Sequence, residues 1–142
     1  MSEYHELGFE NIRQLIVNGS PYMAAAKLEF LAMDETGIVG EMPHQPEFVG
    51  DPDTVVVHGG VVTVFLDSLS GMRILPTLDL RIDYLKPSAP RLDIFARVHC
   101  YKTTRNIAFT RGIAYQNDID APIAHATGSF MLIRLGDAVT SA

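Results

Sequence analysis

The spacing of hydrophobic residues changes from a helical period to a strand period near Pro76. Residues 61–72, just after a His-Gly-Gly sequence, carry few polar side chains, and their hydrophobic members share one broad face of a helical wheel. These members are Val61, Val62, Phe65, Leu69 and Met72. The pattern predicts a buried central helix that starts after His-Gly-Gly and extends to about Leu75.

The polar residues of this predicted helix gather on a narrow stripe. Thr63, Asp67 and Ser70 follow one another at i, i+4 and i+7. A carboxylate on a mostly buried helix costs free energy unless it is paired or used. Asp67 is therefore a candidate functional residue.

Hydrophobic residues recur at every second position after Pro76, which predicts strands. The expected strands before and after the central helix cover residues 27–33, 38–42, 78–84, 92–99, 107–115 and 123–133. The last four are joined by short turns, as in an antiparallel meander. Residues 43–54, rich in Pro, Gly and Asp, are expected to form a loop over the start of the central helix.

The expected fold class is α+β. We expect a single domain of residues 1–142 in which a six-stranded antiparallel sheet curls around one long central helix. Helical spacing at residues 9–18 and a Ser-Pro start before residues 22–26 predict an N-terminal helical extension at about residues 8–26.

The two glycines before the central helix suggest chemistry at its N-terminus. The first N–H groups of a helix lack intrahelical acceptors, and the helix dipole makes that end partly positive. Glycine lets a ligand oxygen approach these donors, so Gly59 and Gly60 could stabilise an oxyanion. The alternative is that both glycines only form a tight turn into a core helix.

The spacing between Gly59 and Asp67 limits how they can work together. Eight residues of helix separate them by about 12 Å, whereas reacting atoms must come within roughly 3–3.5 Å of each other. If both act on one group, Gly59 of one subunit must meet Asp67 of another. Two antiparallel copies of the helix about a two-fold axis would provide two equivalent sites per dimer.

Composition and charge exclude several classes of protein. Hydrophobic residues make up 47% and charged residues 20%, which is typical of a globular protein. No hydrophobic run is long enough for a membrane span, and the acidic N-terminus is unlike a signal peptide. One cysteine, Cys100, cannot form an internal disulfide, which favours a cytoplasmic location. The net charge of −6 disfavours nucleic acid as a partner.

The positive charges are concentrated in one segment. Seven of the eleven basic residues lie between Arg81 and Arg111, with only Asp83 and Asp93 opposing them. Such a segment could bind a small anion such as a nucleotide phosphate, although for any single residue a solvated strand face is the simpler interpretation.

The motifs of residues 27–133 resemble the PaaI-like (phenylacetic-acid-degradation type) branch of the hotdog-fold thioesterases. The resemblance depends on Val57-His58-Gly59-Gly60 followed by Asp67, and on three later motifs. These motifs are Thr77-Leu78-Asp79-Leu80-Arg81-Ile82-Asp83-Tyr84-Leu85-Lys86-Pro87, Thr104-Arg105-Asn106-Ile107-Ala108-Phe109 and Pro122-Ile123-Ala124.

The resemblance implies hydrolysis of acyl-CoA thioesters at a dimer interface, with coenzyme A as part of the substrate and no separate cofactor. It implies that Asp67 serves as nucleophile or as base for a water, and that the Gly59 N–H, helped by Gly60, polarises the thioester carbonyl. Thr77 would help to place the water or the carboxylate. We expect His58 to cap the helix or orient the loop rather than transfer protons.

The resemblance also implies that Lys86, Arg91 and Arg105 meet the nucleotide phosphates, often from a neighbouring subunit. Many such proteins are tetramers built from two dimers, so we expect a homodimer that pairs into a homotetramer.

The loop before His-Gly-Gly departs from the family pattern Asn-Pro-Asp-Thr-Gly. Here Asp51 replaces the Asn and Val55 replaces the Gly. An ionised carboxylate cannot donate a hydrogen bond as an amide can. If Asp51 and Asp67 come close across an interface, repulsion raises one pKa, and we expect a shifted pH optimum or a reduced rate.

Two other functions remain open. A non-catalytic acyl-CoA-binding module is compatible with Asp51 in place of the Asn, since a fold alone does not establish turnover. The hydratase or dehydratase chemistry of the same fold pairs a His with an acid, and His44 is the only candidate for it. The five histidines show no ligand-like spacing, so we expect no metal site.

Overall fold

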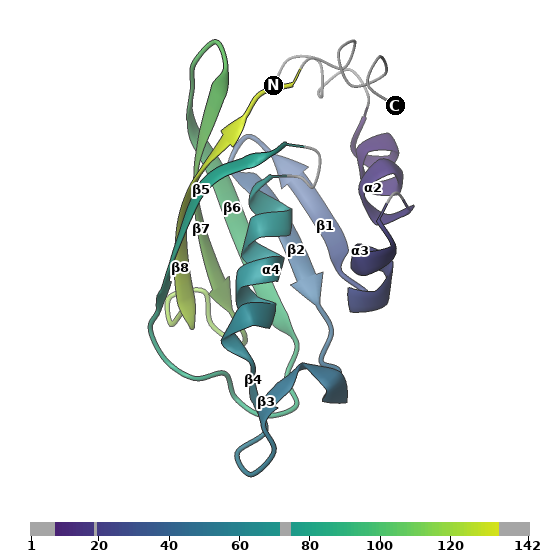
Figure 1. The fold of residues 1–142 in the computed structure, drawn as a ribbon, viewed down its shortest axis with the longest axis vertical. Helices are drawn as coiled ribbons and strands as arrows, with labels where there is room; N and C mark the ends of the chain where they lie inside the picture. Colours follow the sequence, from purple (N-terminus) through teal and green to yellow (C-terminus); the bar gives the residue numbers. More distant parts are fainter. Residues whose placement is uncertain (1–7, 19, 72–74, 134–142) are drawn as a thin grey trace.

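One antiparallel sheet organises the molecule (Figure 1). The computed structural model describes residues 8–18, 20–71 and 75–133. Its six strands are β1 (Glu29–Asp34), β2 (Gly37–Met42), β5 (Thr77–Tyr84), β6 (Ile94–Thr103), β7 (Ile107–Tyr115) and β8 (Ala124–Met131). They lie in the order β1-β2-β6-β7-β8-β5, and every neighbouring pair is antiparallel.

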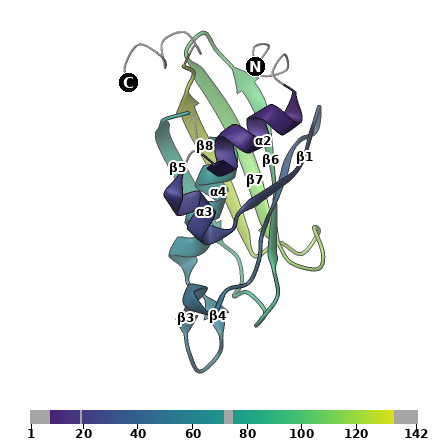
Figure 2. The ribbon, with the colours of Figure 1, turned by 90° about the vertical axis from the view of Figure 1, so that its right-hand side faces the viewer.

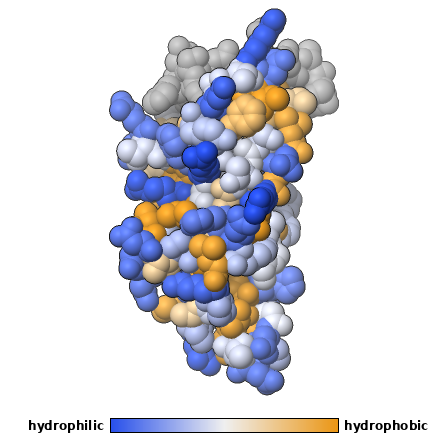
Figure 3. All heavy atoms as spheres, turned by 90° about the vertical axis from the view of Figure 1, so that its left-hand side faces the viewer, coloured by the Kyte–Doolittle hydropathy of each residue, from blue (hydrophilic) through white to orange (hydrophobic). Residues whose placement is uncertain are grey.

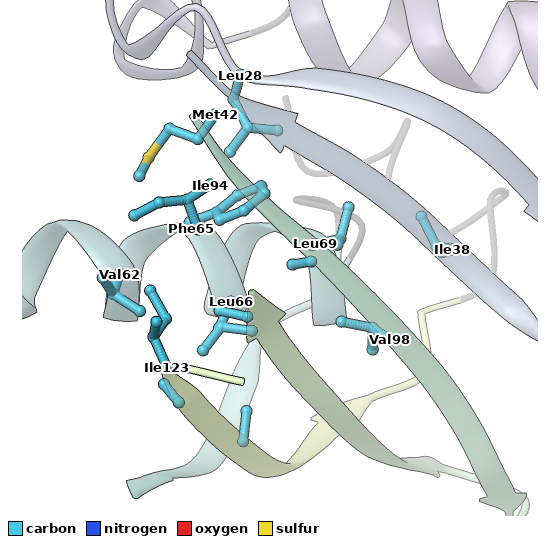
Figure 4. Close-up of a cluster of buried hydrophobic side chains, with 14 of the residues drawn as sticks. Leu28, Ile38, Met42, Val62, Phe65, Leu66, Leu69, Ile94, Val98 and Ile123 are labelled. Carbon is cyan, nitrogen blue, oxygen red and sulfur yellow. The ribbon is translucent and has the colours of Figure 1, made fainter. Parts of the chain in front are cut away.

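The helix α4 (Gly59–Ser70) lies in the hollow of this sheet (Figure 1). Its residues Phe65, Leu66 and Leu69 have no exposed surface and pack with inward-facing strand residues such as Ile94 and Val98 (Figure 4). Burying a side chain of this size contributes about 1.5–3 kcal/mol, so these contacts fix the helix against the sheet. The expected α+β arrangement of a six-stranded sheet curled around one helix is confirmed.

The central helix ends earlier than the hydrophobic pattern indicated. It stops at Ser70, with Gly71 as its C-cap, so its expected extension to about Leu75 was wrong. The Gly71 N–H donates to the carbonyl of Asp67, and a side chain at Gly71 would approach the ring of Phe130 within 3.0 Å. The helix therefore ends where only glycine fits between it and β8. Met72, expected on the helix, lies outside the described residues.

The position of β5 also differs from a simple meander. Its partner is β8, with Thr77 opposite Phe130 and Tyr84 opposite Ala124, instead of β6, which follows it in sequence. β5 is therefore an edge strand, and in the described part of the chain its other edge pairs with nothing. A bulge between Thr77 and Asp79 interrupts the alternation of this strand, and Leu78 and Tyr84 remain 48% and 56% exposed.

Two helices precede the sheet, α2 (Phe9–Asn18) and α3 (Pro21–Ala26), and α2 packs against α3 and β1 (Figure 2). The Ser20 hydroxyl caps α3 by accepting from the Met23 N–H, as the Ser-Pro sequence predicted. Met23 is buried in the same core as α4, so this segment contributes to the packing of the sheet and helix.

A small hairpin occupies part of the expected loop. It consists of the short helix η1 (Pro46–Phe48) and the strands β3 (Val49–Asp51) and β4 (Val56–Val57), and it leads directly into α4. The Val55 N–H closes its turn by donating to the Asp51 carbonyl at 2.8 Å. This closure places Val55 at φ 58°, in the left-handed region that β-branched residues rarely adopt.

The left-handed conformation of Val55 gives a physical reason for the glycine that the family resemblance leads us to expect at this position. An L-residue in this region loses about 1–2 kcal/mol of conformational free energy, whereas glycine loses almost none. The sequence made the substitution visible, but only the backbone angle shows that it introduces strain.

We predict that Val55→Gly does not destabilise the protein and raises the free energy of unfolding by up to about 1 kcal/mol. Relief of the left-handed strain outweighs the entropy that glycine adds to the unfolded chain. Val56→Gly, the same change at the next residue in β4, should instead cost about 1 kcal/mol. Urea denaturation measures both, and equal losses in the two variants would contradict the strain assigned to Val55.

Candidate active site

The two ends of α4 carry the two candidate groups, and β5 runs antiparallel beside them. At the start of β5 the Thr77 hydroxyl donates to Oδ1 of Asp67 at 2.7 Å. At its end the Tyr84 hydroxyl donates to the carbonyl of Gly59 at 2.9 Å. β5 therefore connects the glycine end of α4 to the carboxylate end.

The N-terminus of α4 leaves one backbone donor available. His58 is the N-cap, and its Nδ1 accepts from the Gly60 N–H at 2.9 Å. The next amide, that of Val61, donates to the His58 carbonyl at 2.9 Å. The Gly59 N–H has no acceptor in the part of the chain that the structure describes. Of the two glycines singled out by the sequence, Gly59 therefore carries the donor that a ligand can use, while Gly60 is occupied.

Hydroxyl groups surround the Gly59 carbonyl. Thr63 Oγ1 lies 3.1 Å from it and also within hydrogen-bonding distance of Tyr84 Oη, so the two hydroxyl protons are shared among three contacts. A side chain at Gly59 would meet the Tyr84 ring at 3.2 Å. Thr63 and Tyr84 were not among the predicted site residues, because only the packing of β5 on α4 brings Tyr84 to this helix.

Asp67 borders a hollow of about 390 Å³ between α4, α3 and the start of β5. The side chain is half-buried and its Oδ1 accepts from Thr77, as the sequence predicted for a paired carboxylate. The N-terminal segment contributes Ser20, Tyr22 and Met23 to the lining. Nothing in the spacing of these three residues relates them to Asp67, so only the packing of α3 reveals them at the site.

The predicted polar stripe of α4 is only partly accessible. Thr63 and Asp67 are half-buried beside β5, but Ser70 is 6% exposed, and its hydroxyl has no partner in the part of the chain that the structure describes. Ser70 contributes to the lining of a small internal hollow with Thr110 and Cys100, apart from Asp67. The three residues share one stripe of α4, as predicted, but the sheet covers its last turn, so Ser70 is not exposed beside β5 with Thr63 and Asp67.

Asp51 lies in the β3–β4 hairpin and makes its hydrogen bonds within that hairpin. Its carboxylate accepts from the Thr54 hydroxyl at 2.7 Å and from the Asp53 N–H at 3.1 Å. These bonds, the Thr54 hydroxyl first, hold the pKa of Asp51 below its ordinary value. Within one chain the shift is thus opposite to the one expected from a neighbouring carboxylate, and repulsion by Asp67 would require a second subunit.

The three basic residues expected at the nucleotide lie at both ends of the sheet. Lys86 and Arg91 follow β5, at the Gly59 end, and Arg91 borders a hollow of about 670 Å³ with His44 and Val55. Arg105 lies in the β6–β7 turn, which the strand register places at the Thr77 end. About 20 Å of strand separates the two ends, so one chain does not bring all three residues together.

Other site types are not indicated by the described residues. They contain no group of three or more His, Cys, Asp or Glu side chains placed to hold a metal ion. No described helix has the length and hydropathy needed to cross a membrane.

Comparison with known proteins gives matches to one family. The family model "Thioesterase superfamily" matches residues 55–123. A solved structure from Pseudomonas aeruginosa is 38% identical, with a TM-score of 0.78, and the alignment covers 87% of this chain and 98% of that one. No curated protein sequence matches the chain.

Two further solved structures share the fold. Thioesterase superfamily member 2 from Mus musculus is 18% identical, with a TM-score of 0.74 over 87% of this chain and 96% of that one. A variant of the phenylacetic acid degradation protein PaaI from Thermus thermophilus, in which an Asn is replaced by Asp, is 23% identical. Its TM-score is 0.69 over 80% of this chain and all of that one.

We predict that His58→Ala lowers the free energy of unfolding by about 1 kcal/mol, because the Gly60 N–H loses its capping acceptor. His58→Asn should preserve stability, since asparagine caps a helix N-terminus at least as well. Urea denaturation of the two variants tests this. Equal destabilisation by Ala and Asn would contradict the capping role of His58.

Proposed function

This chain belongs to the hotdog-fold thioesterase superfamily, and from that premise we propose that it hydrolyses acyl-CoA thioesters in a site shared by two subunits. Membership of the superfamily supports thioester hydrolysis in general. The observation that carries the finer proposal is the placement of an unpaired Gly59 N–H at one end of α4 and a Thr77-bound Asp67 at the other.

The unpaired edge of β5 supports assembly into a dimer. An exposed edge strand offers a row of backbone donors and acceptors to a second strand. On this edge Leu78, Tyr84 and Leu85 leave large hydrophobic side chains 48–56% exposed. A second copy that pairs its own β5 here would cover these side chains and continue the sheet.

The register of such a pair follows from the two hydrogen bonds to α4. If the two-fold axis passes between Leu80 and Arg81, Thr77 of one subunit faces Tyr84 of the partner subunit. Thr77 is hydrogen-bonded to the Asp67 carboxylate, and Tyr84 to the Gly59 carbonyl. This register therefore brings Asp67 beside Gly59 of the partner subunit and resolves the separation of about 12 Å along α4.

The shared site has the groups that thioester hydrolysis needs. The Gly59 N–H, at the positive end of α4, would bind the thioester carbonyl oxygen and the negative charge that develops on it. Thr77 occupies Oδ1 of Asp67 and leaves Oδ2 for a water or for direct attack on the carbonyl carbon. In the first case the C–S bond breaks and the thiolate takes up the proton that Asp67 accepted from the attacking water. In the second case the C–S bond breaks to leave a mixed anhydride on Asp67, which water then hydrolyses to the free acid and the Asp67 carboxylate, one water proton passing to the thiolate.

The same register supports a two-subunit site for the nucleotide. It brings the Arg105 end of one sheet toward the end of the other that carries Lys86 and Arg91. Cations from both ends could then contact the phosphates of coenzyme A. Hydrolysis of the bound thioester would require nothing beyond the substrate and water.

In this proposal, the presence of Asp51 in place of the Asn of the family pattern affects the rate of hydrolysis and its pH dependence. A partner-subunit Asp67 near Asp51 would oppose the lowered pKa that the hairpin gives Asp51. A pH–rate profile that is identical in wild type and Asp51→Asn would contradict any such coupling.

We predict that wild type releases thiol from acyl-CoA and that Asp67→Asn lowers kcat by about two to four orders of magnitude, because the base or nucleophile is lost. Thr77→Val should cost about tenfold through the lost hydrogen bond to the carboxylate. Asp79→Asn repeats the Asp-to-Asn change on the face of β5 opposite Thr77, and it should leave kcat unchanged. A panel of short, medium and aryl acyl-CoAs provides the assay, and tight binding without turnover in wild type would instead indicate an acyl-CoA-binding module.

We predict that Gly59→Pro lowers kcat by about two to three orders of magnitude, as loss of an oxyanion donor does. Proline suits this position because it is the first residue of α4 and the backbone of His58 is extended (φ −60°, ψ 132°). Gly59→Ala is the matched control: it adds a Cβ against Tyr84 but keeps the N–H. Equal kcat values for the Pro and Ala variants would show that the Gly59 N–H does not bind the carbonyl oxygen.

A further inference from the structure

The face of the sheet that points away from α4 carries a hollow of about 370 Å³. Two arginines and two histidines contribute to its lining: Arg97 and His99 from β6, Arg111 from β7 and His125 from β8. These side chains alternate with core residues along their strands, so they project to the outer face. Figure 3 shows the side of the molecule on which β5 and β8 lie, where hydrophilic side chains and small hydrophobic patches mix.

The strand register holds these side chains close together. His99 is directly opposite Arg111, and Ile113 lies between Arg97 and His125 on the neighbouring strands. Directly opposed residues of antiparallel strands have Cβ atoms about 4.5–5.5 Å apart, and like charges there repel. Arg97 and Arg111 are diagonal neighbours across β6 and β7, so their two positive charges repel each other unless an opposite charge compensates them.

Compensation from within the chain is small. The single carboxylate in the lining, Asp83, is already paired with Arg81 at 3.0 Å. Among the described residues neither Arg97 nor Arg111 forms an ion pair. Hydrogen bonds from Thr36 and, to a lesser degree, the charge of Arg97 lower the pKa of Asp34, but no ion pair joins Asp34 to Arg97.

Several N–H donors of the Arg97 and Arg111 guanidinium groups have no acceptor among the described residues. Arg97 Nη1 donates to the Thr36 hydroxyl at 3.2 Å, while its Nε is buried without a partner in residues 8–18, 20–71 and 75–133. Arg111 stacks 4.4 Å above the ring of Tyr101, an arrangement that orients the guanidinium, and no hydrogen bond joins its N–H groups to the part of the chain that the structure describes. A buried, unpaired donor is costly, and a charge-assisted acceptor would remove that cost.

We propose that this outer-face hollow binds a small phosphate-bearing anion, such as a phosphomonoester or a diphosphate. Two arginines with unpaired donors match the oxygens of such a group. The volume corresponds to about ten waters at roughly 30 Å³ each, enough for one or two phosphates and part of an attached group. The hollow lies on the face of the sheet opposite α4, so it is separate from the thioester site.

Isothermal titration calorimetry with inorganic phosphate and with pyrophosphate, at constant ionic strength, tests the proposal. We expect one anion per chain in the wild type. Arg97→Gln and Arg111→Gln should each weaken binding by about tenfold, because each removes charge-assisted donors. Arg13→Gln, the same change on α2, should not alter binding, and the thermal midpoint of each variant checks that it is folded.

Asp83→Asn provides a test of opposite sign. It removes the one carboxylate from the lining and releases Arg81, so it should tighten phosphate binding several-fold. A structural defect would weaken binding, so a gain in affinity separates the electrostatic role from damage to the fold.

Three results would overturn the proposal. The first is the absence of phosphate and pyrophosphate binding in wild type, and the second is an equal loss of affinity in Arg13→Gln and the two hollow variants. The third concerns the source of the phosphate. If adenosine 3′,5′-bisphosphate alone binds and the Arg97→Gln/Arg111→Gln double variant raises KM for acyl-CoA, the hollow holds the substrate's own nucleotide instead of a separate ligand.

Discussion

The packing of β5 along α4 is the interaction on which the proposed site depends. Two side-chain hydrogen bonds join the elements, from Thr77 to Asp67 at one end and from Tyr84 to Gly59 at the other. They fix a carboxylate and a helix N-terminus at opposite ends of one rigid unit, about 12 Å apart. A single chain therefore holds both chemical groups but cannot apply them to the same carbonyl. The unpaired outer edge of β5 offers the means to bring two such units together.

Packing and capping hold this unit in place. Phe65, Leu66 and Leu69 fix α4 in the hollow of the sheet, and His58 caps its first turn so that the Gly60 amide is satisfied and the Gly59 amide is not. The hairpin that precedes α4 tolerates left-handed strain at Val55. The strained Val55 and the available Gly59 N–H thus lie close together in sequence at the glycine end of the helix, where strain of this kind is consistent with a functional site.

Local pattern predicted most of the fold, and tertiary packing decided the rest. The alternation after Pro76 and the hydrophobic face of the central helix predicted the strands and α4, because burial on one face imposes those periods. The end of α4 at Ser70, the placement of β5 beside β8, and the burial of Ser70 depend on how the sheet closes around the helix. The Asp67–Thr77 contact agrees with the sequence motif. Tyr84 and the N-terminal wall formed by Ser20 and Tyr22 reach the site only through contacts distant in sequence.

The most direct test of the shared site is activity in mixed dimers of two inactive variants, Asp67→Asn and Gly59→Pro, produced by co-expression. Each mixed dimer would contain one site that carries both defects and one site in which Asp67 and Gly59 are both intact. If the subunits pair at random, half of the dimers are mixed, and the mixture should recover about a quarter of the wild-type kcat. Failure of the mixture to exceed the activity of either variant alone, with mixed dimers confirmed by mass spectrometry, would contradict a site built from two subunits.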